Sequence, residues 1–372
     1  MNIVRLAAAG AGKTWGICRE AISISRNPLK RILLLSYTNK GIESIRAEVE
    51  KQNGGIVPKN INIMSWYQFL LNELIKPYQT YIAGINEIKS LDFSLEHDRN
   101  YAKAGTKQRY ITQKNYVRSE EASNLCIFLN DKSGGKLLNR LEQIYSHLFI
   151  DEIQDLAGRD LDILKAIFKS NISVTCVGDN KQATFQTHTT RANRKFSGNN
   201  VNIYFSMLQN EGLADIQYSL CSRRFNEDIC CFANKVYPNE NVMTTSMNIK
   251  TNHDGVFIIE KKDAQSYFDF YHPQELRYDK KTSDICGMYA INFGNCKGKT
   301  FNRCLIYTNK PMINFLKGKP LNSPEKYYIA VTRARFSNTF IVDKLFDVPG
   351  FIPYTIDLND TKISAMKFTG NS

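Results

Sequence analysis

The sequence predicts an α/β fold with parallel sheets in two domains, and three observations lead to that prediction. The 372 residues exceed the roughly 100–200 residues of one ordinary domain. An apolar strand at residues 2–7 is followed by a helical pattern at residues 14–25 that ends before Pro28. A second buried strand at residues 148–150 ends in two acids. Buried strands that alternate with helices are typical of parallel sheets.

Charge and cysteine content narrow the class of protein. The net charge of +13 favours a polyanionic partner such as nucleic acid, although a merely basic surface explains it equally well. The nine cysteines contain no C-x-x-C pair, which favours a reducing cytosol. The beginning of the chain shows no charged leader with an apolar run, and no apolar run approaches the roughly 20 residues of a membrane helix. We therefore expect a cytoplasmic protein without a membrane partner.

The segment A-A-A-G-A-G-K-T at residues 7–14 joins the first strand to the first helix. Its glycines allow backbone amides to turn around phosphate oxygens, although Ala7 stands where the strict phosphate-loop pattern has glycine. Lys13 can reach the terminal phosphates, and the Thr14 hydroxyl can bind Mg²⁺. The predicted nucleotide contacts in this loop are Ala9, Gly10, Ala11, Gly12, Lys13 and Thr14.

An acidic pair, Asp151 and Glu152, follows the buried strand at residues 148–150. Hydrolysis of a bound nucleotide needs a carboxylate near Mg²⁺ and a base for the attacking water. Asp151 suits the first role and Glu152 the second. Together with the loop, the pair predicts a site for Mg²⁺ and a nucleoside triphosphate.

Six segments in this order resemble superfamily 1A helicases, the UvrD, Rep and PcrA group. These segments are SYTNKGIESIRAEVE (36–50), DEIQD (151–155), VGDNKQATF (177–185), LCSRRFNEDICCFAN (220–234), NFGNCKGKTFNRCLIY (292–307) and YYIAVTRAR (327–335). The resemblance implies two RecA-like domains, at residues 1–215 and 216–372, with a small insertion in the first at about residues 70–145. We expect strands in the second at residues 255–260, 287–293, 303–307 and 338–343, and a poorly structured tail or edge segment from Phe346 onward.

The resemblance also implies roles for residues near the nucleotide. Gln182 corresponds to a glutamine that senses the γ-phosphate, and Arg224 and Arg333 correspond to two arginine fingers. ATP would then act as a clamp between the two domains. The family's adenine-reading glutamine motif is absent, so we expect Arg223 to stack on the base, and Gly298 to lie near the nucleotide.

Nucleic-acid contacts are expected from both the resemblance and local composition. The insertion contains a stretch of residues 99–118 with six cations, no acid and interleaved tyrosines, which suits a single strand or an ordinary solvated loop. Trp66 and Phe69 suit either a strand contact or the core. The predicted contacts are Thr38, Asn39, Lys40, Ser65, Trp66, Lys107, Arg109, Phe185, His188 and Lys297.

Two departures from the family leave two functions open. Thr187 replaces the tryptophan that stacks on bases, and only about 50 residues separate Asn234 from Tyr289, where longer relatives insert a helical subdomain. The first function is an ATP- and Mg²⁺-dependent translocase on single-stranded or forked DNA, with 3′-to-5′ helicase activity implied by the family. The second is a regulatory DNA-sensing ATPase beside a nuclease. Short helicases of this kind resemble the helicase subunit of Gabija-type phage-defence pairs, which acts with an OLD-type nuclease.

Overall fold

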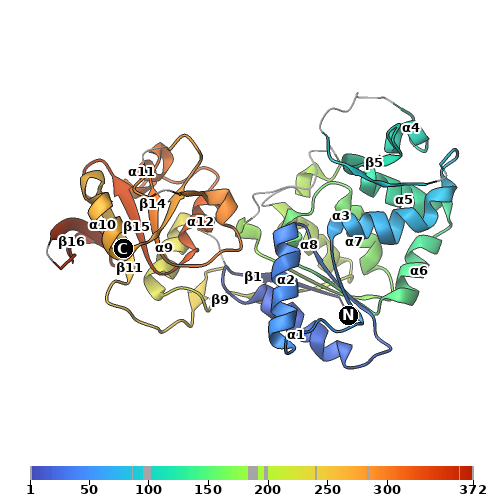
Figure 1. The fold of residues 1–372 in the computed structure, drawn as a ribbon, viewed down its shortest axis with the longest axis horizontal. Coiled ribbons are helices and arrows are strands. Elements are labelled where there is room, and N and C mark those ends of the chain that lie inside the picture. The colour runs from blue at the N-terminus through green and yellow to red at the C-terminus, as the bar shows by residue number, and fades with distance from the viewer. Residues whose placement is uncertain are drawn as a thin grey trace. The chain divides into compact units, whose positions relative to one another are not determined.

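The computed structural model describes residues 2–85, 87–94, 102–182, 192–196, 200–238, 241–282, 285–287, 289–359 and 361–370. The chain forms two compact units (Figure 1). The first unit comprises Met1–Leu6 and Lys13–Tyr218, and the second comprises Ala7–Gly12 and Ser219–Ser372. Each unit contains a sheet whose central strands are parallel, which confirms the α/β prediction.

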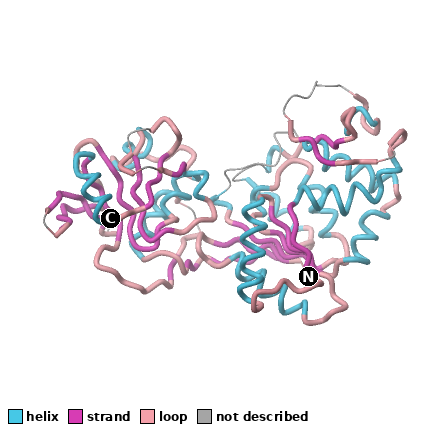
Figure 2. The backbone as a smooth tube through the Cα atoms, in the orientation of Figure 1, coloured by secondary structure: helices cyan, strands magenta, loops and turns pink. Residues whose placement is uncertain are grey.

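A six-stranded sheet organises the first unit, and its strands are drawn in magenta in Figure 2. In spatial order the strands are β3 (Ile61–Ser65), β2 (Ile32–Ser36), β6 (His147–Ile150), β7 (Ser173–Gly178), β1 (Ile3–Ala7) and β8 (Asp215–Ser219). The helices are α1 (Lys13–Ser25), α2 (Asn39–Gln52), α3 (Trp66–Phe69), α4 (Lys107–Tyr110), α5 (Ala122–Lys132), α6 (Lys136–Ile144), α7 (Asp160–Phe168) and α8 (Val201–Asn210).

Strand β2 shows why this sheet is covered on both faces. Its five residues are all buried, as expected for a central strand of a parallel sheet. Ile32 and Leu34 pack with residues of α1 and α2, whereas Leu33 and Leu35 pack with the larger core that contains α3, α5, α7 and α8. Because alternate side chains point to opposite faces, one apolar strand supplies two cores.

The chain between β3 and β6 extends the larger core. It contains a π-helical turn at Leu70–Ile75, a 3₁₀ turn at Lys76–Tyr81 and the parallel pair β4 (Ser90–Asp92) and β5 (Tyr116–Arg118). Leu70, Leu74 and Ile75 are buried in the same core as the sheet. This segment is therefore packed on the first unit through apolar side chains.

A seven-stranded sheet organises the second unit. Its spatial order is β13 (Ile291–Asn292), β12 (Gln274–Arg277), β14 (Phe301–Tyr307), β15 (Ala334–Val342), β11 (Gly255–Glu260), β17 (Lys362–Phe368) and β16 (Phe351–Asp357). Strands β9 (Cys221–Ser222) and β10 (Thr244–Thr245) form a separate parallel pair. The helices are α9 (Glu227–Val236), α10 (Ala264–Tyr271), α11 (Lys310–Leu316) and α12 (Glu325–Val331).

The C-terminal segment is more regular than the sequence predicts. Strands β16 and β17 pair antiparallel, and β17 also pairs antiparallel with β11. Proline lacks the amide needed inside a sheet, so Pro353 made the prediction of an edge segment reasonable. It lies in β16, the outermost strand in the order given above, where that missing donor is tolerated. Of the two alternatives for this segment, the edge segment is correct and the poorly structured tail is wrong.

The expected strand at residues 287–293 is reduced to the two residues of β13. The buried Glu275 carboxylate accepts the backbone amides of Cys286 at 2.8 Å and Gly287 at 2.9 Å. These amides are therefore satisfied by a side chain in place of a neighbouring strand. Tyr307 donates its hydroxyl to the same carboxylate at 2.6 Å, which holds the loop on β14.

His253 is buried between two aromatic rings in the second unit. It stacks on Phe257 and on Tyr271, each with a centroid separation of 4.2 Å, and its Nε2 lies 2.8 Å from the Tyr267 hydroxyl. Burial, followed by the positive charge of Arg303, lowers the pKa of His253 from 6.5 to about 3. The unfolded chain therefore binds a proton below pH 6.5 that the folded chain rejects.

This shift predicts that stability falls as the pH drops from about 6.5 towards 3, by up to about 1.4 kcal/mol per pH unit. His253→Gln should flatten this dependence when melting temperature is followed by circular dichroism between pH 7 and pH 4.5. His272→Asn, at an exposed helix end, is the control and should keep the parental dependence. Equal pH dependence in the parent and His253→Gln would contradict the prediction.

Within the described ranges, no helix is long and apolar enough to cross a membrane.

Candidate nucleotide site

Residues 7–12, the backbone of the predicted phosphate loop, belong to the second unit, and Lys13 and Thr14 begin α1 in the first. Gly10 and Gly12 have φ values of 77° and 83°, which residues with a side chain rarely adopt. A Cβ atom at Gly10 would lie 2.6 Å from the Ser222 hydroxyl and 2.6 Å from the Cβ of Arg224. Glycine is therefore required at position 10 for both its conformation and the space around it.

The loop backbone is fixed inside the second unit by hydrogen bonds. Ala8 donates its amide to the Ser219 carbonyl at 2.9 Å, and Arg223 donates its amide to the Gly10 carbonyl at 3.0 Å. The buried Tyr328 hydroxyl accepts the Ala9 amide at 3.4 Å. These contacts shape the loop, and Tyr328 belongs to the last of the six motifs.

Thr14 and Asp151 form the pair that could hold a divalent cation. Thr14 Oγ1 donates to Asp151 Oδ2 at 2.7 Å, and Asp151 is only 4 % exposed. Burial, then the neighbouring Glu152, raises the pKa of Asp151 to about 6, while Thr14 and Lys13 act in the opposite direction. A buried carboxylate beside a hydroxyl, with its ionised form disfavoured, fits Mg²⁺, which prefers oxygen ligands and supplies the compensating charge.

Glu152 follows in a left-handed conformation, with φ of 57°. Non-glycine residues adopt this conformation rarely, and it is common at functional turns. The Glu152 amide donates to Asp151 Oδ1 at 2.9 Å, and the Gln154 side-chain amide donates to the Glu152 carboxylate. Two neighbouring side chains therefore fix both the backbone and the carboxylate of the predicted base.

Asp179, which follows β7, links the acidic segment after β6 to Lys13. Its Oδ2 lies 4.0 Å from Lys13 Nζ and accepts Gln182 Nε2 at 2.7 Å. Its amide donates to the Gln154 side-chain oxygen at 3.0 Å. Asp179 and Gln182 are only 2 % and 5 % exposed. The structure thus brings together the predicted residues Lys13, Thr14, Asp151, Glu152 and Gln182 and adds Asp179 and Gln154.

Sequence reasoning missed Asp179, although it is the acid of the V-G-D segment. We predict that Asp179→Asn lowers nucleotide turnover about 10- to 100-fold. The reason is that the negative charge facing Gln182 and Lys13 is lost. Nucleotide affinity should change less than threefold, since Lys13 and Thr14 remain. Steady-state hydrolysis and nucleotide titration measure the two effects. Asp162→Asn, which alters the pair with Arg159 and the hydrogen bond that Asn193 donates to Asp162 at 3.0 Å, is the matched control and should change neither.

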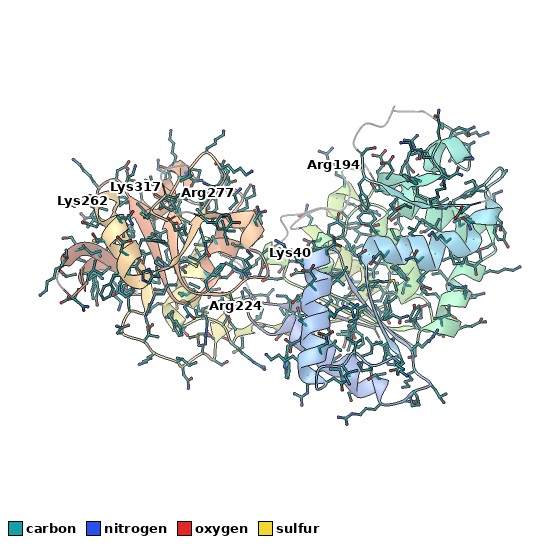
Figure 3. The ribbon with its side chains drawn as sticks, viewed as in Figure 1. Lys40, Arg194, Arg224, Lys262, Arg277 and Lys317 are labelled. Atoms are coloured by element: carbon teal, nitrogen blue, oxygen red, sulfur yellow. The ribbon has the colours of Figure 1, made fainter. Side chains whose placement is uncertain are left out.

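The two predicted arginine fingers meet at Thr332 within the second unit. Arg224 Nη1 donates to the Thr332 carbonyl at 3.1 Å, and Arg333 Nη2 donates to the Thr332 hydroxyl at 3.0 Å. Arg333 also donates to the carbonyls of Ile329 at 2.9 Å and Lys299 at 3.3 Å, and it is 1 % exposed. Figure 3 labels Arg224. Their role at the phosphates stays a prediction.

The remaining predicted residues of the second unit lie at its surface or half-buried. Arg223 is exposed, and its backbone contacts Gly10. Lys297 is half-buried and follows the 3₁₀ turn Phe293–Cys296, and Gly298 follows with a positive φ of 81°. The stacking of Arg223 on a base stays a prediction.

The predicted nucleic-acid contacts of the first unit divide into exposed and buried residues. Thr38, Asn39 and Lys40 are exposed at the start of α2, where Thr38 caps the helix by accepting the Gly41 amide at 3.0 Å (Figure 3 labels Lys40). Trp66 is 1 % exposed, and its ring packs on Phe69 with a centroid distance of 5.5 Å. The core alternative for Trp66 is therefore correct, and base stacking on it is not proposed.

The other predicted contacts are more constrained than the sequence indicates. Ser65 is buried and caps α3 by accepting the Gln68 amide at 3.1 Å. Lys107 donates to the Gly84 carbonyl at 2.9 Å, and Arg109 pairs with Glu121 at 3.3 Å. The acid that pairs with Arg109 lies just outside the basic stretch. Phe185 and His188 lie outside the described residues.

Two sheets with parallel central strands, a phosphate loop at the start of a helix and buried acids at two strand ends define a phosphate-loop nucleotide-binding protein. The chain belongs to the superfamily 1 helicases: residues 132–342, more than half of the chain, match the viral superfamily 1 RNA helicase core domain. Residues 59–193 match the UvrD/REP helicase N-terminal domain. The prediction of a superfamily 1 helicase is confirmed, and the short UvrD-like form stays a prediction.

Two solved structures of an arterivirus helicase, nonstructural protein 10, are similar to the chain. One is 13 % identical with a TM-score of 0.47, and it covers 91 % of this chain and 59 % of the viral chain. The other, a complex with DNA, is 12 % identical with a TM-score of 0.47, and it covers 94 % and 62 %. The chain thus spans about three fifths of the length of these proteins. No curated protein matches the chain.

Proposed function

We propose that the chain is an Mg²⁺–ATP-dependent motor that moves along single-stranded DNA and acts as a 3′-to-5′ helicase. The observation that carries the proposal is a connected group of side chains beside the ends of β6 and β7. In it, Thr14 contacts Asp151, and Asp179 contacts both Lys13 and Gln182. Membership of the superfamily 1 helicases supports the choice of nucleic acid as the track. The polarity and the choice of DNA come from the family resemblance alone.

Each residue of the site has a defined task in this proposal. Lys13 binds the terminal phosphates, while Thr14 and Asp151 hold Mg²⁺. Bound Mg²⁺ would neutralise charge that develops on the phosphates. Glu152, held by Gln154, accepts the proton of the attacking water.

The remaining groups act on the terminal phosphate. Gln182, positioned by Asp179, senses it. Arg224 and Arg333 would add positive charge, an effect of about 10³- to 10⁵-fold in rate for such arginines.

The second candidate is a regulatory DNA-sensing ATPase that does not unwind duplex. The observation that favours it is the segment after α9, where longer relatives insert a helical subdomain. Here the described residues of that segment form β10, β11, α10 and β12, and three of these elements build the second unit's own sheet and core. A nuclease partner belongs to this candidate by resemblance only. We propose a role in DNA repair or phage defence for the motor by the same resemblance, and the cysteine content favours a cytoplasmic location for either candidate.

A forked DNA with a labelled strand separates the two candidates. Under the motor proposal, single-stranded DNA stimulates hydrolysis, and Mg²⁺–ATP releases the labelled strand. Hydrolysis that is stimulated without strand release would favour the sensor. Hydrolysis that single strands do not stimulate would count against both.

The basic stretch in the insertion gives a separate prediction about affinity for single strands. Lys107→Ala with Arg109→Ala should weaken binding and reduce the slope of log affinity against log salt by about 1.4, because each phosphate contact to a single strand contributes about 0.7. Anisotropy titrations at several salt concentrations measure the slope. Lys261→Ala with Lys262→Ala, at exposed positions of the second unit, removes the same charge and should leave the slope unchanged. An unchanged slope in the first variant would make the stretch an ordinary solvated loop.

A further inference from the structure

The solvent-facing side of α1 carries a row of side chains that the nucleotide site does not use. Ile17, Cys18 and Ala21 are the buried residues of α1 and pack into the core of the first unit. Trp15, Arg19, Ser23 and Arg26, spaced three or four residues apart, are exposed on the other side. Residues at this spacing form one stripe along a helix.

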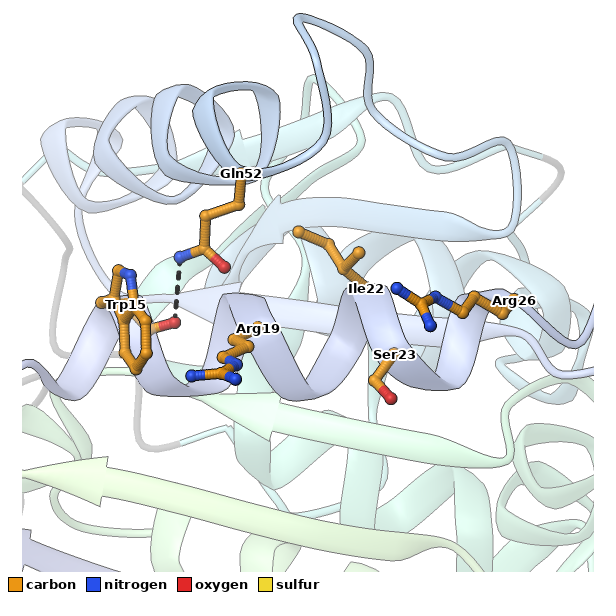
Figure 4. A pocket seen from close by; sticks show the side chains of 6 residues that line it. All are labelled: Trp15, Arg19, Ile22, Ser23, Arg26 and Gln52. Carbon is orange, nitrogen blue, oxygen red and sulfur yellow. Dashed lines mark hydrogen bonds between the residues drawn. The ribbon is translucent and has the colours of Figure 1, made fainter.

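This stripe borders a groove of about 440 Å³. The groove is lined by Trp15, Arg19, Ile22, Ser23, Arg26 and Gln52. Figure 4 shows Trp15, Arg19, Ile22 and Ser23 on α1, Arg26 directly after its last residue, and Gln52 at the end of α2. Gln52 Nε2 donates to the Trp15 carbonyl at 3.1 Å, which ties the two helices together at one end of the groove.

The groove is positively charged. In the part of the chain that the structure describes, no carboxylate oxygen lies within 4.0 Å of the Arg19 or Arg26 guanidinium group. Of the acids on α1 and α2, Glu20 pairs with Arg5 at 3.0 Å, and Glu48 accepts Nε2 of the groove residue Gln52 at 2.8 Å. Arg109, Arg140 and Arg159, by contrast, each pair with an acid. The charges of the two groove arginines are therefore not offset by a carboxylate in direct contact.

An aromatic surface lies beside this charge. Trp15 is 40 % exposed, although it lies in the first turn of a helix whose other side packs into the core. The Arg19 guanidinium carbon lies 5.1 Å from the centre of the indole ring. The indole ring offers a ligand an apolar face, and the guanidinium groups attract negative charge.

We propose that this groove is an additional binding site for single-stranded nucleic acid, with a base against Trp15 and phosphates on Arg19 and Arg26. The proposal rests on the proposed function only in taking nucleic acid as the ligand. Cations interleaved with an aromatic ring suit a single strand, whose bases expose flat faces and whose backbone carries a charge at each step. A simple inorganic anion would use the arginines but not the ring.

The length of the stripe matches a short strand. Arg19 lies in α1 and Arg26 directly follows the last residue of α1, so the two are about 10 Å apart along the helix axis at about 1.5 Å per residue. Stacked nucleotides advance about 3.4 Å per step, so the two guanidinium groups match phosphates about three steps apart. Because α1 begins with Lys13 and Thr14, the strand would lie on the same helix that holds the nucleotide's phosphates.

Tryptophan fluorescence tests the site directly. The chain has two tryptophans, and Trp66 is buried, so a strand in the groove should quench Trp15 selectively. A 12-nucleotide oligo-dT should quench the emission of the parent and of Lys13→Ala, measured without ATP. Trp15→Phe should abolish the quenching. Arg19→Ala with Arg26→Ala should raise the oligonucleotide concentration needed for half-maximal quenching about 5- to 20-fold. It should also reduce the slope of log affinity against log salt by about 1.4.

Lys280→Ala with Lys281→Ala is the charge-matched control, because both lysines are exposed in the second unit. It should retain the parental quenching curve. Circular dichroism of each variant establishes that the fold is kept. A quenching curve of Arg19→Ala with Arg26→Ala that is identical to the parental curve would overturn the site.

Two further outcomes separate this site from the proposed function. Oligo-dT that binds by anisotropy without quenching Trp15 would overturn this site and leave the proposed function in place. The absence of any oligo-dT binding would overturn both. Equal quenching by poly-glutamate at matched charge would assign the groove to an acidic protein segment and overturn the nucleic-acid ligand.

Discussion

Glu152→Gln is expected to lower ATP turnover by about 10²- to 10⁴-fold, the range of a lost general base. Glutamine keeps the size of the side chain, but it cannot accept the proton of the attacking water. Lys13, Thr14 and Asp151 are unchanged, so the variant should still bind Mg²⁺–ATP with nearly parental affinity. Steady-state phosphate release and titration with a fluorescent nucleotide measure the two quantities.

Glu43→Gln is the matched control, since Glu43 is exposed on α2 and contributes no contact to the site. It should hydrolyse ATP at the parental rate. If Glu152→Gln also does so, Glu152 is not the base. If Glu152→Gln instead loses nucleotide binding, the main role of Glu152 is to hold the turn through its left-handed backbone and its hydrogen bonds with Asp151 and Gln154.

Lys13→Ala should lower turnover by about 10²- to 10³-fold, comparable to the loss of one preorganised donor at a reacting centre. The physical reason is the loss of the positive charge that Lys13 is proposed to place on the phosphates, in a largely buried site where Lys13 Nζ lies 4.0 Å from Asp179. Nucleotide affinity should also fall at least tenfold, because Lys13 contacts the phosphates in the bound state as well as in the transition state. The same two assays measure both effects.

Lys59→Ala removes an exposed lysine of the same unit and serves as the control. It should leave turnover and affinity unchanged. Parental turnover in Lys13→Ala would mean that residues 7–14 do not bind the phosphates of the hydrolysed nucleotide.

The sequence predicted those parts of the site that short motifs encode. Lys13 and Thr14 follow a glycine loop, and Asp151 and Glu152 end a buried strand. In a parallel sheet such ends gather at one edge. Thr14 and Asp151 are in contact at 2.7 Å, and their role as metal ligands stays a prediction. Local spacing is enough in these cases, because the backbone itself positions the side chains.

Other features depend on contacts that no local pattern records. Asp179 was missed because its importance comes from Lys13, Gln154 and Gln182, which reach it from three segments. The segment after Phe346 was left open between a tail and an edge segment because Pro353 lowers strand propensity, while pairing of β17 with β11 and β16 decides the outcome. Likewise, only the packed core shows that Trp66 is inaccessible and Trp15 is not.

Displacement of streptavidin from biotinylated single-stranded DNA tests the central claim most directly, because it reports movement without requiring duplex separation. With Mg²⁺–ATP, the parent protein should displace streptavidin from the 5′ end of the strand, and Glu152→Gln should not. Stimulated hydrolysis in the parent with no displacement from either end would contradict the account, because ATP would then be consumed without movement.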